Sequence, residues 1–312
     1  MRLPLPKKSQ SGTVGLDLDG RFLSAVQAGD RKVARAVSSE LPAGLIKDGE
    51  VVDIDGLSEA IKGFFKEAGL PNRVRLGVSN QQIVVRHLEL PQIANPTELA
   101  AAVRFQAAEA IAMPLDEAVL DYQVLGETTA PDGSARLRVL VVAARAAMIE
   151  RFVDSVSSAG LKAEGIDLNA FALVRALSKD ASEPAEDTPA TVYCHLGGVT
   201  NLAIAVGSSC LFTRPLSTDW DEDGEHVAFA LAEEIRLSID YYMAQPDARP
   251  AGEVKLSGPG ARIEGLAEQL EPLIHLPVSV AEPLGALTHG ELGDEDPYRH
   301  TVAAGLALGA AA

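Results

Sequence analysis

The stretch VYCHLGGVTNLAIAVG, residues 192–207, decides the fold. Small apolar residues alternate on both sides of a Gly-Gly pair, which predicts two short strands joined by a tight turn. A second stretch, VGLDLDGRFLSAVQAG at residues 14–29, aligns with the first without a gap and places Asp17 opposite His195 and Gly20 opposite Gly198. The separation of the two hairpins is far longer than that of solenoid repeats, so it predicts an internal duplication.

Length and composition limit the class of protein. A chain of 312 residues exceeds the usual size of a single hydrophobic core, so we expect two lobes. The formal charge of -17 disfavours nucleic acid and anionic lipid as partners. Two cysteines are too few for a disulfide framework, and the adjacent Cys194 and His195 would point to opposite faces of a strand, which excludes a shared metal ion.

The N-terminal segment and the hydropathy pattern indicate a cytoplasmic protein. Residues 1–11 lack the apolar core of a signal peptide, so we expect a flexible tail. No apolar run reaches the length that a transmembrane helix needs.

Strands and helices alternate along both halves. A separate module begins near residue 82, and its helix from Pro96 to Ile111 follows the capping residue Asn95, with Glu98 completing a capping box. The polar spacer SKDASEPAEDTPA, residues 178–190, predicts a hinge. After it, LSGPGAR at residues 256–262 predicts a strand, a glycine turn and a helix that starts at Ala261.

Two glycine hairpins on opposite lobes suit a polyphosphate ligand. Tight turns expose consecutive backbone amides, and a carboxylate beside such a turn can hold magnesium. Each hairpin alone is a common structural element, but the order of two hairpins and a Gly-Pro-Gly loop favours a nucleotide site.

The chain resembles the PilM family of type IV pilus assembly proteins, which are actin-like and related to the cell-division protein FtsA. The resemblance covers nearly the whole chain and rests on VGLDLDG, LELP, AAVRFQAAEAIAMPLDEAVLDYQVLG, the run from residue 139 to 177, EEIRLSIDYY, and LSGPGARIEGLAEQLEPLIHLPVSVAEPL. It implies an α/β, actin-like (ribonuclease H-like, duplicated) two-lobed fold with an inserted FtsA-type subdomain.

The resemblance also implies a division of the chain into parts. After the tail 1–11, residues 12–81 would begin lobe 1, 82–160 would form the inserted subdomain, 161–182 would return to lobe 1, 183–296 would form lobe 2, and 297–312 would be a C-terminal helix that returns to lobe 1.

Site residues follow from the same resemblance, with ATP and magnesium as the expected cofactors. Asp17 would be catalytic and reach magnesium, and Asp167 would orient the attacking water, although an aspartate that opens a helix also serves as an N-cap. Glu233 and Arg236 would flank the ribose, unless they form an ordinary ion pair on a solvated helix. The full nucleotide set is Asp17, Asp19, Gly20, Gly197, Gly198, Thr200, Glu233, Arg236, Gly258 and Gly260.

Two departures from the family pattern bear on catalysis. Asp19 stands where the first hairpin usually has glycine, and a carboxylate against phosphate costs affinity unless a metal ion bridges them. His195 replaces the usual aspartate of the second hairpin; phosphate would raise its pKa, but histidine is a poor magnesium ligand. We therefore expect ATP hydrolysis that is slow or absent, and both slow turnover and a vestigial pocket remain open.

The expected partner is the N-terminal peptide of a PilN-like membrane protein, held beside the inserted module. Its groove would include Arg104, Phe105, Ile111, Met113 and Leu115, although Phe105, Ile111 and Leu115 also fit the buried stripe of an amphipathic helix. The resemblance further implies self-association, contact with other inner-membrane platform proteins and a peripheral place at the inner face of the membrane. The alternatives are an actin-fold sugar kinase, for which no carboxylate base stands out, and a polymer-forming scaffold without nucleotide dependence.

Overall fold

The computed structural model describes residues 13–29, 31–130, 132–178, 185, 187–220, 224–245, 248–285, 287–289 and 295–309. The expected N-terminal tail and most of the polar spacer lie outside these residues. The chain forms two compact units: Asn80–Asp154 is one, and the rest of the chain is the other. The predicted insert, 82–160, extends past the first of these units because helix α3, Ala146–Ser158, crosses the boundary.

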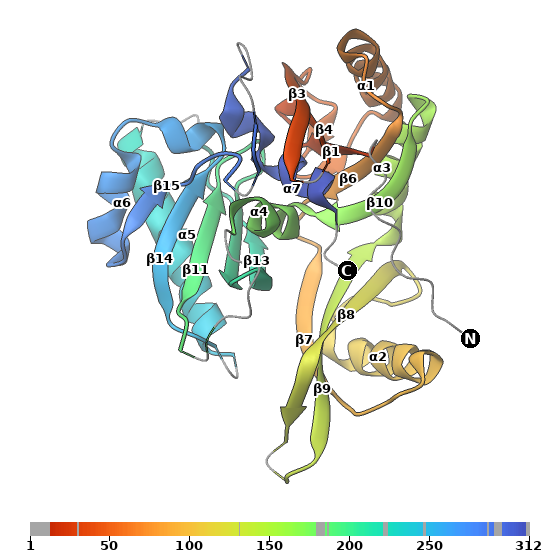
Figure 1. Ribbon diagram of the computed structural model, residues 1–312, viewed down its shortest axis with the longest axis vertical. Coiled ribbons are helices and arrows are strands. Elements are labelled where there is room, and N and C mark those ends of the chain that lie inside the picture. Colours follow the sequence, from red (N-terminus) through yellow and green to blue (C-terminus); the bar gives the residue numbers. More distant parts are fainter. Residues whose placement is uncertain are drawn as a thin grey trace. The chain divides into compact units, whose positions relative to one another are not determined.

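The larger unit contains two five-stranded sheets with the same topology (Figure 1). In lobe 1 the strand order is β3-β2-β1-β6-β10, with β1–β2–β3 antiparallel and β1–β6–β10 parallel. The bounds are Val14–Leu18 for β1, Phe22–Gly29 for β2, Lys32–Glu40 for β3, Arg73–Val78 for β6 and Lys162–Leu168 for β10.

Lobe 2 repeats this order as β13-β12-β11-β14-β15. The strands β11–β12–β13 are antiparallel and β11–β14–β15 are parallel, so each hairpin occupies the equivalent place in its sheet. The duplication that the two glycine stretches predict is therefore present in the topology. The bounds are Ala190–His195 for β11, Asn201–Val206 for β12, Ser209–Pro215 for β13, Ala251–Ser257 for β14 and Val278–Val280 for β15.

Helices α4, Asn169–Leu177, and α7, Thr301–Leu308, pack against each other and connect the two lobes. Helix α4 buries Leu173 and Val174 against β12 and β13 of lobe 2, and α7 packs on β1 and β2 of lobe 1. The close approach requires Gly305, because a Cβ there would overlap the main chain of Ala172.

The other helices cover the outer faces of the sheets. Helix α5, Gly224–Met243, and α6, Leu266–Ile274, pack together and bury the alternate residues of β11, among them Val192 and Cys194. In lobe 1, the short pair β4, Ile46–Lys47, and β5, Glu50–Val51, leads into α1, Ile54–Ala68, which ends at Gly69 in the left-handed conformation. The 3₁₀ turns η1 and η2 cover Pro259–Arg262 and Pro297–His300.

The smaller unit is a three-stranded antiparallel sheet with one helix on it. The strand order is β7-β9-β8, with bounds Val84–Pro91, Ala118–Thr129 and Ala135–Arg145 for β7, β8 and β9. Helix α2, Pro96–Ala110, buries Leu99, Val103 and Ala107 against the sheet, and Asn95 caps it by accepting from the Thr97 amide. Within the described ranges, no helix is long and apolar enough to cross a membrane.

Candidate functional site

The turn of the first hairpin is built around the carboxylate of Asp19. Its Oδ1 accepts hydrogen bonds from the backbone amides of Arg21, at 2.8 Å, and Phe22, at 2.7 Å. Gly20, between Asp19 and Arg21, has φ +93°, a left-handed conformation in which any residue with a side chain would be strained. The aspartate thus caps the same amides that the sequence assigns to phosphate.

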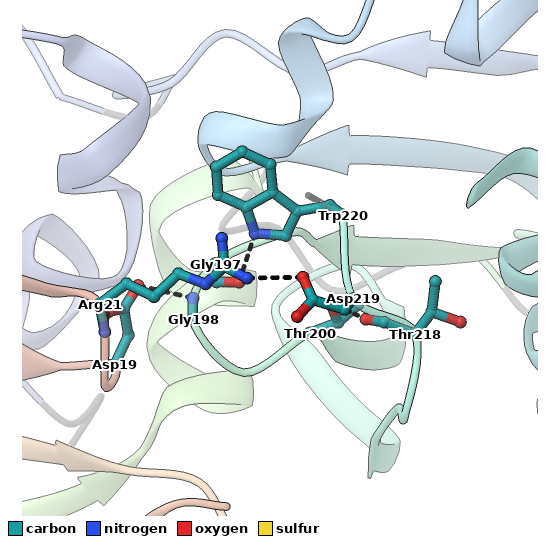
Figure 2. A network of polar contacts seen from close by, with 8 residues as sticks. All are labelled: Asp19, Arg21, Gly197, Gly198, Thr200, Thr218, Asp219 and Trp220. Carbon is teal, nitrogen blue, oxygen red and sulfur yellow. Dashed lines mark hydrogen bonds and ion pairs between the residues drawn. The ribbon is translucent and has the colours of Figure 1, made fainter. Parts of the chain in front are cut away.

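The second hairpin contributes an amide to the same carboxylate. The backbone N–H of Gly198 donates to Asp19 Oδ2 at 2.8 Å, across 179 positions of sequence (Figure 2). A Cβ on Gly198 would lie 2.8 Å from the carbonyl carbon of Asp19, so only glycine allows the two hairpins to approach this closely. The structure therefore brings the two predicted hairpins together through Asp19.

Arg21 of the first hairpin contacts Asp219 and Trp220 on the loop that follows β13. Arg21 Nη2 forms an ion pair with Asp219 Oδ1 at 2.5 Å, and its guanidinium lies 4.8 Å from the ring centroid of Trp220. The indole Nε1 of Trp220 donates to the carbonyl oxygen of Gly197 at 2.6 Å (Figure 2). Sequence reasoning missed Asp219 and Trp220, although Trp220 is the single tryptophan of the chain.

The third glycine motif lies against this tryptophan. Gly258 has φ +82°, and a Cβ there would lie 2.5 Å from the carbonyl oxygen of Leu196. A Cβ on Gly260 would lie 2.7 Å from Cγ of Trp220, so the indole packs directly on this residue. The expected helix from Ala261 is wrong: the short turn η1 occupies the place, and α6 starts only at Leu266.

Asp17 is buried next to a residue that the sequence reasoning did not select. Asn169 Nδ2 donates to Asp17 Oδ1 at 3.1 Å, and the other amide atom, Asn169 Oδ1, is buried without a hydrogen-bond partner. Burial, followed by the charge of Asp19, raises the pKa of Asp17 well above its usual range. The available signal was a polar residue at the start of a helix whose next five residues are apolar.

His195 lies at the end of β11 and is only 4% exposed. Its Nδ1 is 2.9 Å from the hydroxyl of Ser257 on the neighbouring strand, and burial lowers its pKa to about 4. A Cβ on Gly197 would lie 3.0 Å from His195 Nε2 and 3.0 Å from Asp19 Oδ2, so both atoms face this glycine. The imidazole is neutral at pH 7, so it brings no positive charge to the turn.

Asp167 and Thr200 have other partners in the structure. Asp167 is the last residue but one of β10 and forms an ion pair with Arg175 at 2.8 Å. The N-cap of α4 is Leu168, whose side chain does not cap this helix. The N-cap role considered for Asp167 is therefore wrong. Thr200 is buried, and its hydroxyl donates to the Thr218 carbonyl at 2.8 Å.

Glu233 and Arg236 form an exposed ion pair at 3.4 Å on α5. Arg236 lines a depression with Met243, Ile274 and His275, residues that belong to none of the glycine motifs. The neighbouring Glu234 accepts from the amides of Ser217 and Thr218, so it orders the loop that precedes Trp220.

In the smaller unit, the expected groove residues divide into core and surface. Ile111 and Leu115 lie in the core rather than on the surface, and Met113 packs against that core. The buried-stripe interpretation of Phe105 is wrong, because this side chain is 70% exposed on α2. Arg104 Nη2 donates to the Leu115 carbonyl at 3.2 Å and so fastens the helix to the loop that follows it.

The model of the family described as type IV pilus assembly protein PilM matches residues 22–217, more than half of the chain. The chain belongs to this family. The match begins at β2, the second strand of the first hairpin, contains the whole smaller unit and ends after the second hairpin.

Solved structures agree on the fold. A structure entitled PilM-PilN type IV pilus biogenesis complex is 22% identical, with a TM-score of 0.80, and the match covers 96% of this chain and 98% of that one. MreB5 of Spiroplasma citri bound to ADP is 12% identical, with 96% of each chain covered and a TM-score of 0.53. The ethanolamine utilization protein EutJ from Carboxydothermus hydrogenoformans is 14% identical, with 98% and 90% covered and a TM-score of 0.52. The fold is the expected actin-like one.

The residues around the hairpins do not fit a nucleotide in this conformation. The Gly198 amide, which would face a phosphate, already donates to Asp19, and Gly260, another residue of the expected nucleotide set, is in contact with Trp220. Across the part of the chain that the structure describes, no group of three or more His, Cys, Asp or Glu side chains could hold a metal ion.

Proposed function

We propose that this PilM-family protein is a cytoplasmic, membrane-peripheral adaptor of type IV pilus assembly that binds the N-terminal peptide of a PilN-like inner-membrane protein. Family membership and the similarity to a PilM-PilN complex support the proposal. ATP hydrolysis would be slow or absent, because His195 is neutral and the carboxylate of Asp19 faces the turn amides.

The observation that carries the partner proposal is the exposure of Phe105. This aromatic ring stands on α2 of the smaller unit, on the side away from the buried Leu99, Val103 and Ala107. Its exposed neighbours one turn away on either side are Ala101, Ala108 and Glu109. A few large side chains carry most of the binding energy of a protein interface, and an exposed aromatic ring can fill a pocket of the partner in this way.

The test measures binding of a synthetic peptide with the N-terminal sequence of the PilN-like protein. Phe105→Glu should weaken peptide binding by about tenfold or more, because it replaces an aromatic ring that the peptide would cover in the complex by a charged side chain. The matched control is Phe229→Glu, since Phe229 is 62% exposed on α5 of the other unit. Both variants should keep the circular dichroism and melting temperature of the wild type.

Equal peptide affinity of the wild type and Phe105→Glu would show that the partner does not contact this face of α2. An equal loss in Phe229→Glu would show that added negative charge, and not the lost aromatic ring, is responsible.

A further inference from the structure

We infer that the carboxylate of Asp19 occupies the position between the two hairpins that a nucleotide phosphate would need. It thereby excludes polyphosphates from the site. The inference concerns the cleft alone, so it goes beyond the proposed function and stands whether or not a partner peptide binds.

The hydrogen bonds of the carboxylate are those of a bound anion. Asp19 accepts from the amides of Arg21 and Phe22 in its own hairpin and from the Gly198 amide of the opposite lobe, all at 2.7–2.8 Å. Turns with successive free N–H groups are anion sites, and here the anion belongs to the chain. Any phosphate that used the Gly198 amide would first have to displace Asp19.

Arg21 supplies the positive charge that this arrangement needs. Burial raises the pKa of Asp19, and the three backbone amides and the charge of Arg21 oppose this shift by favouring the ionised form. The guanidinium of Arg21 pairs with Asp219 on the loop of lobe 2. Arg21 thus donates its backbone amide to Asp19 in lobe 1 and pairs its guanidinium with Asp219 in lobe 2. The cation that could otherwise attract a phosphate is therefore paired with Asp219.

Side chains of the protein also occupy the space next to the Gly-Pro-Gly loop. Trp220 lies on Gly260, donates its indole N–H to Gly197, and stacks with Arg21. Figure 2 shows Trp220, Arg21, Asp19 and Asp219 gathered around Gly197 and Gly198 of the second hairpin. Glu234, through the amides of Ser217 and Thr218, holds the loop that carries the ring.

Asp19→Asn separates the interlobe contact from the fold of the hairpin. The asparagine Oδ1 can still accept from the amides of Arg21 and Phe22, but its Nδ2 group cannot accept from Gly198. The variant is also neutral, so it no longer repels a phosphate. Asp19→Ser is a second variant, because its hydroxyl is short enough to serve its own turn without reaching Gly198.

The experiment titrates each full-length protein with Mg-ATP and follows the fluorescence of Trp220, the single tryptophan, with calorimetry as a second readout. Asp19→Asn should bind Mg-ATP at least about tenfold more tightly than the wild type, the factor expected for one charge-assisted hydrogen bond. The matched control is Asp240→Asn, which removes the same charge from an exposed position on α5 and should titrate like the wild type.

Saturable binding to the wild type with an affinity equal to or higher than that of Asp19→Asn would overturn the inference. Absence of binding to both folded Asp19 variants would overturn it as well, because Asp19 would then not be the residue that excludes the nucleotide. Partner-peptide binding by the wild type is unaffected in either case, so the two proposals fail separately.

Discussion

The neutral state of His195 predicts a specific dependence of stability on pH. Burial holds the folded-state pKa at about 4, against 6.5 for an exposed histidine. A group whose pKa is lower in the folded state stabilises the fold above its unfolded pKa and loses that contribution as the pH falls. His195 should therefore destabilise the protein progressively from pH 6.5 downward.

The magnitude follows from the two pKa values. Between pH 8 and pH 5, a shift from 6.5 to about 4 changes the free energy of unfolding by about 2 kcal/mol. His195→Asn removes the titrating group, while its amide keeps a partner for the hydroxyl of Ser257, 2.9 Å from the imidazole Nδ1. The wild type should thus lose about 2 kcal/mol more than this variant over the same interval.

Urea unfolding at pH 8, 6.5 and 5, followed by Trp220 fluorescence, measures this difference in the unit that contains His195. The buried His300, whose pKa is also lowered by burial, contributes equally to both proteins and cancels. His275→Asn is the control, because His275 is exposed and its φ of +56° suits asparagine. Parallel losses of stability in the wild type and His195→Asn would refute the reasoning.

Three further substitutions, the first with a control in α1, test the contacts of the site residues by thermal or urea unfolding. Gly198→Ala should lower the free energy of unfolding by about 1–3 kcal/mol, because its Cβ would overlap the main chain of Asp19. The control Gly63→Ala has open space in helix α1 and should raise the free energy of unfolding by up to about 1 kcal/mol. Equal effects of the two substitutions would contradict the contact between Gly198 and Asp19. Trp220→Phe should cost about 1 kcal/mol through the lost bond to the Gly197 carbonyl, and an unchanged midpoint measured by circular dichroism would argue against that bond. Asp167→Asn should cost about 1–3 kcal/mol by weakening the pair with Arg175; if stability is unchanged while ATP hydrolysis falls, Asp167 has the water-orienting role instead.

The glycine patterns were sufficient to predict the duplicated topology. Alternation of small apolar residues around a glycine turn is a local signal, because strand pairing across a tight turn depends on residues close in sequence. The strand order is the same in both lobes, as the gapless alignment of the two stretches implies. The resemblance to the PilM family rests on the same local runs, and the family match contains the second strand of the first hairpin and the whole second hairpin.

The orientation of α2 could not be predicted from the sequence. Alanines occur on all sides of this helix, so the pattern does not show which face is buried. Burial is set by the sheet beneath, which takes Leu99, Val103 and Ala107 and leaves Phe105 in solvent.

By itself, the sequence determined the elements, their duplication, the glycines of the turns and the two departures at Asp19 and His195. Only the tertiary structure decided what these departures do, because their partners are distant in sequence. Gly198 lies 179 positions from Asp19, and Asn169 lies 152 positions from Asp17. Such hydrogen bonds depend on how elements distant in sequence pack together, within lobe 1 for Asp17 and between the lobes for Asp19, and no local propensity encodes them.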